Sequence, residues 1–152
     1  MIKYQKVMFV SESGTTEAPL AAEIFNRDIP EKQYQAEARG LVVLFPEPAN
    51  PKIVAIAKSR GIDLENFKAR ELMESDFGAD TLVLVMTEKQ KIRVYSDYKE
   101  AINVFSMTEF AEEAGEVHNP YGDDLQGYGA FFESMEVLVQ KIIYKLYKEE
   151  DR

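Results

Sequence analysis

The chain has 152 residues, of which 45% are hydrophobic and 30% are charged, as in an ordinary soluble globular protein. Its 27 acidic and 18 basic residues give a formal net charge of −9, and an acidic surface repels the phosphate backbone, which excludes general nucleic-acid binding. The sequence contains no cysteine, so disulfides, thiolate metal sites and thiol catalysis are excluded together.

In the first third of the chain, apolar runs alternate with helical patterns, which is typical of parallel strands joined by crossover helices. The sequence predicts a buried strand at 6–10 and a small-residue loop at 11–16. Pro19 then opens a helix, because proline suits a first turn whose N–H groups have no intrahelical acceptor. A short second strand is expected at 34–38, and prolines in and beside 41–50 predict an ordered loop there.

The rest of the chain continues this alternation and ends in a long helix. We expect a helix at 51–60, a helix at 65–73, a strand at 81–86, a helix at 88–95, a strand at 101–105 and helical turns at 107–113. After a turn at 119–122, an amphipathic helix extends to about residue 149, and its core-facing positions are Phe131, Met135, Val139, Ile142, Ile143 and Leu146. No internal repeat or linker is evident, so we expect residues 1–152 to form one domain.

Two expectations concern the location of the protein. No apolar run has the length needed to cross a bilayer. The first ten residues lead into a strand-like segment instead of the long apolar stretch of a signal peptide. We therefore expect a cytoplasmic protein without a membrane partner.

The loop between the first strand and the first helix is the best candidate for a binding site. Its successive main-chain N–H groups can converge on an anion, and the helix N-terminus adds partial positive charge. Alternatively, the small residues simply form a tight turn, and the loop alone does not decide between these readings. The candidate ligand-binding residues are Ser11, Glu12, Ser13, Gly14, Thr15, Thr16 and Glu17.

Residues 9–25, with the sequence FVSESGTTEAPLAAEIF, resemble the start of the low-molecular-weight protein tyrosine phosphatases. The signature of that family is a strand followed by C-x5-R-S-P and a helix. With Pro19 as the anchor, Ser11 stands at the place of the nucleophilic cysteine and Glu17 at the place of the arginine that clamps the phosphate. Ala18 takes the place of the serine that follows the arginine.

The resemblance continues in later segments. Similar blocks occur at 38–41 (ARGL), 61–64 (GIDL), 68–70 (KAR), 81–87 (TLVLVMT) and 119–122 (NPYG). In the last block, Asn119 replaces the aspartate that is the general acid of the family. The order and spacing of the blocks imply a three-layer α/β/α fold like that of phosphotyrosine protein phosphatase I, with a four-stranded parallel sheet in the order 2-1-3-4.

The same resemblance implies that the catalytic groups are missing. In the family, a cysteine thiolate attacks phosphorus, an arginine binds the phosphoryl oxygens and an aspartic acid protonates the leaving group. Here a serine without an evident base, a carboxylate and an amide stand in those places. We therefore expect a pseudophosphatase with no active catalytic residue, no metal and no cofactor, whose degenerate positions are Ser11, Glu17 and Asn119.

Such a protein is expected to act as a binding or regulatory module. Because Glu12 and Glu17 make the former phosphate loop negative, its ligand, a small molecule or a peptide, is expected to be cationic or neutral. We expect Leu41 and Tyr121 at the rim of the cleft. Glu17 itself is interpreted as a solvent-facing residue that favours the helix dipole. The only histidine, His118, is interpreted as a loop residue.

Two other functions stay open. An altered phosphate-ester hydrolase would use Ser11 as its nucleophile and Glu12 or Glu17 as its base, although no third, orienting group is evident. A flavodoxin-like protein would bind FMN through residues 11–18, because SESGTTEA is similar to the flavodoxin phosphate loop T/S-x-T-G-N-T-E. The flavodoxin alternative requires five strands, whereas four are evident in the sequence.

Overall fold

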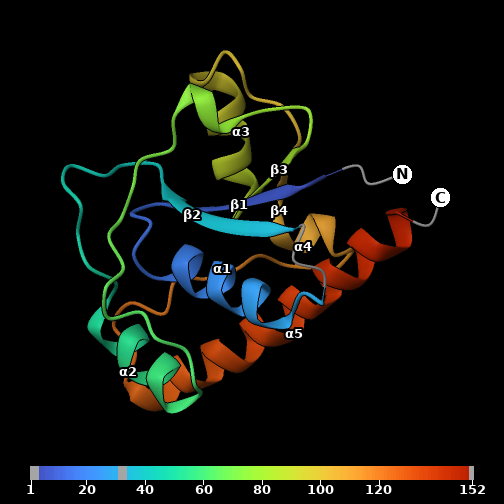
Figure 1. The fold of residues 1–152 in the computed structure, drawn as a ribbon. Coiled ribbons are helices and arrows are strands. Elements are labelled where there is room, and N and C mark those ends of the chain that lie inside the picture. The colour runs from blue at the N-terminus through green and yellow to red at the C-terminus, as the bar shows by residue number, and fades with distance from the viewer. Residues whose placement is uncertain (1–3, 31–33, 151–152) are drawn as a thin grey trace.

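The structure, a computed structural model, describes residues 4–30 and 34–150, and the other residues of the expected domain at 1–152 lie outside the described part. Its centre is a four-stranded parallel sheet in the order β2-β1-β3-β4, which confirms the predicted architecture (Figure 1). The strands are β1 (Lys6–Ser11), β2 (Gln35–Gly40), β3 (Thr81–Val85) and β4 (Val104–Ser106).

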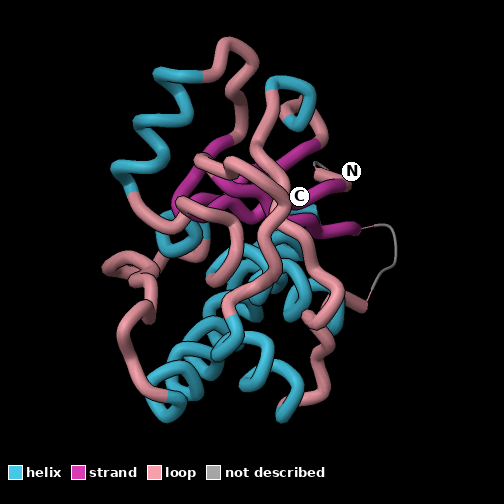
Figure 2. Tube along the Cα trace, turned by 90° about the vertical axis from the view of Figure 1, so that its left-hand side faces the viewer, coloured by secondary structure: helices cyan, strands magenta, loops and turns pink. Residues whose placement is uncertain are grey.

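Helices cover both faces of the sheet (Figures 1 and 2). On one face, α1 (Glu17–Asp28) packs against α5 (Leu125–Glu150), and α2 (Pro51–Ser59) packs on α5. On the other face lies α3 (Glu88–Asp97). The remaining helical segments are the 3-10 turn η1 (Glu74–Asp76) and the short helix α4 (Met107–Phe110).

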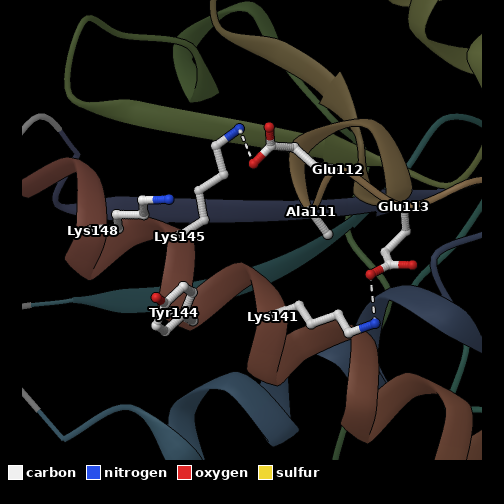
Figure 3. A pocket seen from close by; sticks show the side chains of 7 residues that line it. All are labelled: Ala111, Glu112, Glu113, Lys141, Tyr144, Lys145 and Lys148. Atoms are coloured by element: carbon white, nitrogen blue, oxygen red, sulfur yellow. Dashed lines mark hydrogen bonds and ion pairs between the residues drawn. The ribbon is translucent and has the colours of Figure 1, made fainter.

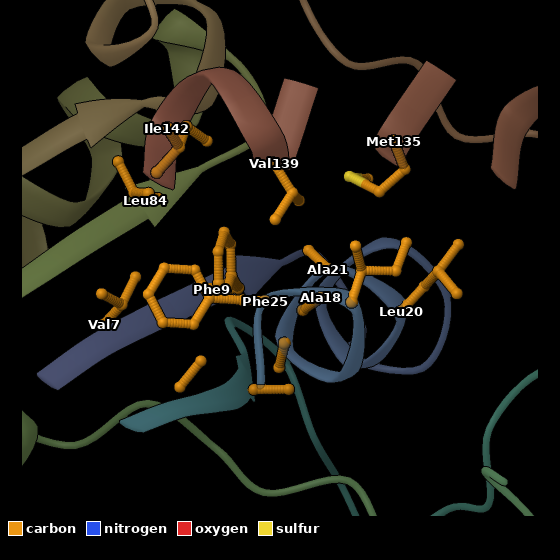
Figure 4. Packing of buried hydrophobic residues seen from close by; sticks show 14 of the residues in the cluster. Val7, Phe9, Ala18, Leu20, Ala21, Phe25, Leu84, Met135, Val139 and Ile142 are labelled. Atoms are coloured by element: carbon orange, nitrogen blue, oxygen red, sulfur yellow. The ribbon is translucent and has the colours of Figure 1, made fainter. Parts of the chain in front are cut away.

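The alternation of side chains along β1 divides the core into two parts. Val7 and Phe9 belong to the cluster that packs against α1 and α5 (Figure 4). Met8 and Val10 belong to a second cluster, on the side of α3. Ser11 continues the series of Val7 and Phe9, because successive side chains of a strand point to opposite faces. Its side chain therefore lies on the face of the sheet that α1 covers.

The predicted helix at 65–73 is wrong. Most of this segment has no regular secondary structure, and Glu71 forms an isolated parallel bridge with Gly40 at the end of β2. The Gly40 N–H donates to the Arg70 carbonyl at 2.8 Å, and the Leu72 N–H donates to the Gly40 carbonyl at 2.9 Å. Tertiary pairing with β2 thus overrides the local helical pattern.

Other elements differ from the prediction at their ends. α1 begins at Glu17, two residues before the proline that was expected to open it, and β4 covers 104–106 instead of 101–105. In α5, Phe132 is fully buried, whereas Phe131, the predicted core residue, is only half-buried. Across residues 4–30 and 34–150, no helix combines the length and the apolar character that a membrane span requires.

Candidate functional site

The candidate loop connects β1 to α1 at the carboxyl edge of the sheet, where ligands of open α/β sheets bind. The loop that follows β2 is hydrogen-bonded to it at both ends. The Leu41 N–H donates to the carbonyls of Ser11 and Glu12, at 3.0 Å in each case. The Asn50 N–H donates to the Thr15 carbonyl at 2.9 Å. The main chain therefore sets the shape of the candidate loop.

Two glycines allow these loops to approach each other closely. Gly14 has a φ of 69°, a left-handed conformation that favours glycine. A Cβ on Gly14 would lie 2.8 Å from the main-chain nitrogen of Gly40, and a Cβ on Gly40 would lie 2.7 Å from the carbonyl carbon of Ser13. A side chain at either position would therefore push the two main chains apart.

The loop carries hydrogen-bond donors that the protein itself does not use. Within the described part of the chain, the main-chain N–H groups of residues 13–16 donate no hydrogen bond. The Ser11 side chain is fully buried, and its hydroxyl has no partner among the described residues either. Consecutive free N–H groups ahead of a helix form the kind of concavity that binds anions.

Glu17 is the first residue of α1, and it is only 4% exposed. The prediction of a solvent-facing carboxylate at this position is therefore wrong. Burial raises the pKa of Glu17, and its own main-chain N–H and the Asn119 amide counteract part of that rise, while the nearby charge of Glu12 adds to it. The helix N-terminus thus does not fully compensate the loss of water around this carboxylate.

Asn119 joins Glu17 from a segment 102 residues further along the chain. Its Nδ2 donates to Oε1 of Glu17 at 3.2 Å, and its Oδ1 accepts the N–H of Tyr121 at 2.7 Å. Both ends of the amide are therefore used, and the turn that carries Asn119 is held against the first turn of α1. We call this hydrogen bond between Glu17 and Asn119 the latch. The structure thus brings together two of the three predicted degenerate positions.

Glu12 has a partner that the sequence did not reveal. Its carboxylate accepts hydrogen bonds from Nη1 of Arg93, in α3, at 2.8 and 2.9 Å. Arg93 lies 81 residues away, and no motif or spacing connects the two positions. A cationic ligand would therefore compete with Arg93 for Glu12.

The predicted rim residues have different environments. The Leu41 side chain is buried in the core cluster on the side of α3, so its prediction as a rim residue is wrong. Tyr121 is 84% exposed and lies two residues after Asn119. Leu44 and Phe45, which were not among the predicted site residues, are exposed apolar residues in the loop after β2. The signal for them was the apolar run ahead of the prolines of that loop.

Two cavities are lined by other parts of the molecule. One, of about 370 Å³, lies beside α5 and is lined by lysines and acidic residues, among them the pairs Lys141–Glu113 and Lys145–Glu112 (Figure 3). The other, of about 250 Å³, has His118 in its lining together with apolar residues of α5. His118 therefore borders a cavity beside α5, and the ligand loop does not contribute to that cavity.

No base is hydrogen-bonded to the candidate nucleophile in the described structure. A serine nucleophile needs a base within hydrogen-bond reach, and the Ser11 hydroxyl has no such partner in the described structure. The Glu17 carboxylate accepts a hydrogen bond from the side-chain amide of Asn119. No group of three histidine, aspartate or glutamate side chains in residues 4–30 and 34–150 is arranged to hold a metal ion.

Comparison with known sequences gives one clear family. Its model, described as "Low molecular weight phosphotyrosine protein phosphatase", matches residues 6–152. The low molecular weight protein-tyrosine-phosphatase PtpB of Staphylococcus aureus is 26% identical over 137 residues, which cover 90% of this chain and 96% of that protein. The PtpB protein of Staphylococcus haemolyticus is 23% identical over 137 residues, with the same coverage.

Solved structures agree with this result. The low molecular weight protein tyrosine phosphatase from T. tengcongensis is 34% identical, with a TM-score of 0.86 over 93% of this chain and 99% of that chain. The YwlE arginine phosphatase from Geobacillus stearothermophilus is 23% identical, with a TM-score of 0.85 and coverages of 96% and 95%. A cysteine-to-serine mutant of YwlE arginine phosphatase with a phosphorylated active site serine is 26% identical, with a TM-score of 0.84 and coverages of 94% and 96%. These matches give no support to the flavodoxin-like alternative.

Proposed function

Because this chain belongs to the low molecular weight phosphotyrosine protein phosphatase family, we propose that it is a pseudophosphatase, a binding or regulatory module that does not transfer phosphoryl groups. The observation that carries the proposal is the buried carboxylate of Glu17 at the first turn of α1. We further propose that residues 1–152 act as one domain in the cytoplasm. Limited proteolysis and cell fractionation test these two assignments.

The position of Glu17 opposes both substrate binding and catalysis. A phosphate dianion held about 5 Å from this carboxylate would be repelled by on the order of 5 kcal/mol at an effective dielectric constant of about 20. A phosphatase needs a cation at this point, because charge builds up on the phosphoryl oxygens in the transition state. An ionised Glu17 therefore acts against the charge distribution that phosphoryl transfer requires.

The two other degenerate positions support the same proposal. The Ser11 hydroxyl is much harder to ionise than a thiol and has no hydrogen-bonded base in the described structure. Asn119 cannot donate a proton as an acid, and both ends of its amide are engaged by Glu17 and Tyr121. Nucleophile, cation and acid are thus replaced together.

We propose that the ligand of this module is neutral or cationic. An ionised Glu17 disfavours anions, and the exposed apolar side chains of Leu44 and Phe45 follow the strand next to the loop and offer a surface for an uncharged group. A basic peptide or an amine is the first probe, with inorganic phosphate as the comparison. Binding of phosphate without binding of any amine or basic peptide to the natural chain would disprove this ligand class.

The decisive experiment measures hydrolysis of an aryl phosphate and of phosphoarginine, since the similar structures include tyrosine and arginine phosphatases. The natural chain is compared with the triple variant Ser11→Cys, Glu17→Arg, Asn119→Asp. We expect no turnover by the natural chain and measurable turnover by the triple variant. Turnover by the natural chain that disappears in Ser11→Ala would overturn the proposal.

A second candidate function is a phosphate-ester hydrolase that uses Ser11. The observation in its favour is the similar YwlE mutant whose active site serine is phosphorylated. If Ser11 attacks a phosphate ester, incubation with an aryl phosphate should add a phosphoryl group to it. Mass spectrometry of the Ser11 peptide detects this, and an unmodified peptide after prolonged incubation argues against the hydrolase.

A further inference from the structure

The most informative feature outside the proposed function is the set of unused donors in the candidate loop. The main-chain N–H groups of residues 13–16 have no acceptor within the described structure, and they precede a helix of 12 residues. Independently, the Ser11 hydroxyl is fully buried and unpartnered. Ser11 is the last residue of β1, and strand alternation places its hydroxyl on the face of the sheet that α1 covers, directly before the loop. Both observations indicate a position for an oxyanion.

The shape of this position does not depend on an anion. Close contact between the main chains at Gly14 and Gly40 fixes the middle of the loop. Hydrogen bonds from Leu41 and Asn50 to the loop carbonyls fix its ends. A loop held in this way keeps its N–H groups oriented when no ligand is present, so it should bind an anion without first having to fold.

The latch explains how such a site is kept closed. Glu17 places a buried carboxylate at the head of α1, where an anion would interact with the helix. Asn119 donates to this carboxylate and brings its own turn against the same helix end. The site therefore meets an incoming anion with a like charge, next to a turn that is hydrogen-bonded to the same carboxylate.

We propose that residues 11–16 retain a working oxyanion site and that the Glu17 carboxylate, held by Asn119, is the group that closes it to phosphate and sulfate. Neutralising Glu17 alone opens the site, without restoring a cysteine or an arginine. The inference rests on the proposed function in one respect, namely that the natural chain does not bind or turn over phosphate groups through this loop.

The test is a titration of the protein with inorganic phosphate at neutral pH, in which calorimetry and phosphorus NMR detect binding. We expect Glu17→Gln to bind phosphate at least about tenfold more tightly than the natural chain, since removal of a like charge near the ligand is worth more than the free energy of a tenfold change. Glu23→Gln is the matched control, because it removes the same charge from the same helix outside the loop. It should leave phosphate binding unchanged.

A second variant locates the bound anion. Adding Ser11→Ala to Glu17→Gln should weaken the gained phosphate binding by about threefold to tenfold, because one donor to the anion is lost. Equal phosphate affinity of Glu17→Gln and the natural chain would overturn the inference, and so would an equal gain in Glu23→Gln. Phosphate binding that does not respond to Ser11→Ala would also overturn it, because the anion would then lie elsewhere.

The outcome is separable from that of the proposed function. Hydrolysis of an aryl phosphate by the natural chain tests the pseudophosphatase proposal, whereas phosphate binding by Glu17→Gln tests the latch. Circular dichroism and the thermal midpoint of each variant show whether it is folded. Asn119→Ala, which removes the latch donor and keeps the Glu17 charge, should gain less phosphate affinity than Glu17→Gln, and a larger gain would show that charge is not the closing element.

Discussion

Two charged residues of the described chain, Arg39 and Glu17, are buried, and their surroundings differ. Arg39 of β2 is 5% exposed and donates to Asp76 at 3.2 and 3.4 Å, to Glu37 at 3.3 Å and to the Ala38 carbonyl at 2.9 Å. Glu17 is 4% exposed, and the side chain that binds it is a single neutral amide. One buried charge is thus paired with opposite charges, and the other is not.

The difference separates a structural charge from a functional one. A buried charge that is paired and hydrogen-bonded contributes to the fold, because removing its partner leaves an uncompensated charge. A buried carboxylate without a cation opposes folding when it is ionised, and such groups are concentrated at functional sites. We therefore assign Arg39 to the scaffold, and the environment of Glu17 supports its place in the proposed site.

The largest change in the free energy of unfolding is expected from removal of Arg39, the buried charge that is paired. Arg39→Met should lower the free energy of unfolding by about 3 kcal/mol, because it leaves the carboxylate of Asp76 without its cation. Urea denaturation measures this change. Arg27→Met is the matched control: Arg27 forms exposed pairs with Asp28 and Glu136, so its loss should be below about 1 kcal/mol. Equal losses in the two variants would contradict the distinction between a buried and an exposed pair.

Removal of the charge of Glu17 is expected to change the free energy of unfolding by a smaller amount and in the opposite direction. Glu17→Gln should raise the free energy of unfolding at pH 7.5 by about 1 kcal/mol, because the amide keeps the shape of the side chain without the buried charge. Urea denaturation of the natural chain and of Glu23→Gln provides the comparison. If Glu17→Gln is instead clearly less stable than the natural chain, the carboxylate has a stabilising partner that the comparison with Arg39 ignores.

The pH dependence of stability tests whether the buried charge of Glu17 opposes folding. The folded state raises the pKa of Glu17 above its ordinary value of 4.5, mainly by burial, with the Glu12 charge as a further cause and the Asn119 amide counteracting it. The folded protein therefore binds this proton more tightly than the unfolded chain, and stability falls as the pH rises from the ordinary pKa through the raised one. The stability difference between Glu17→Gln and the natural chain should grow over that interval and then level off. A difference that is constant from pH 4 to pH 8 would show that this carboxyl group does not titrate abnormally.

The smallest effect is expected at Ser11. Ser11→Ala removes a buried hydroxyl that has no partner, so the free energy of unfolding should stay equal or rise by about 0.5 kcal/mol. Ser13→Ala should instead cost up to about 1 kcal/mol, because the Ser13 hydroxyl is hydrogen-bonded to that of Thr15 at 2.7 Å. A marked loss of stability in Ser11→Ala would mean that its hydroxyl is satisfied in solution.

The sequence was sufficient for the strands of the sheet and the position of the candidate loop, because strands, the loop and Pro19 follow one another in a local pattern. The strand order came from the resemblance to the phosphatase family. The sequence was insufficient for the burial of Glu17, which depends on a turn more than one hundred residues later. The same limit explains the wrong helix at 65–73, whose backbone pairs with Gly40 instead. The link between Glu12 and Arg93 has no local signal either. Local patterns therefore predicted the position of the candidate loop, whereas the burial and the partners of its charged side chains depend on long-range contacts.

The contact between Gly14 and Gly40 has a consequence for how this protein can diverge. A side chain at either glycine would collide with the main chain that carries the other. Substitution of one glycine alone would therefore deform both loops. This constraint does not apply to Ser11 or Glu17, whose side chains take no part in the contact between the two glycines and differ from the family signature. If the chain is a pseudophosphatase, as proposed, selection for folding alone would preserve the shape of the proposed oxyanion site after the activity is lost. Such a scaffold can acquire a new ligand by exchange of a few side chains.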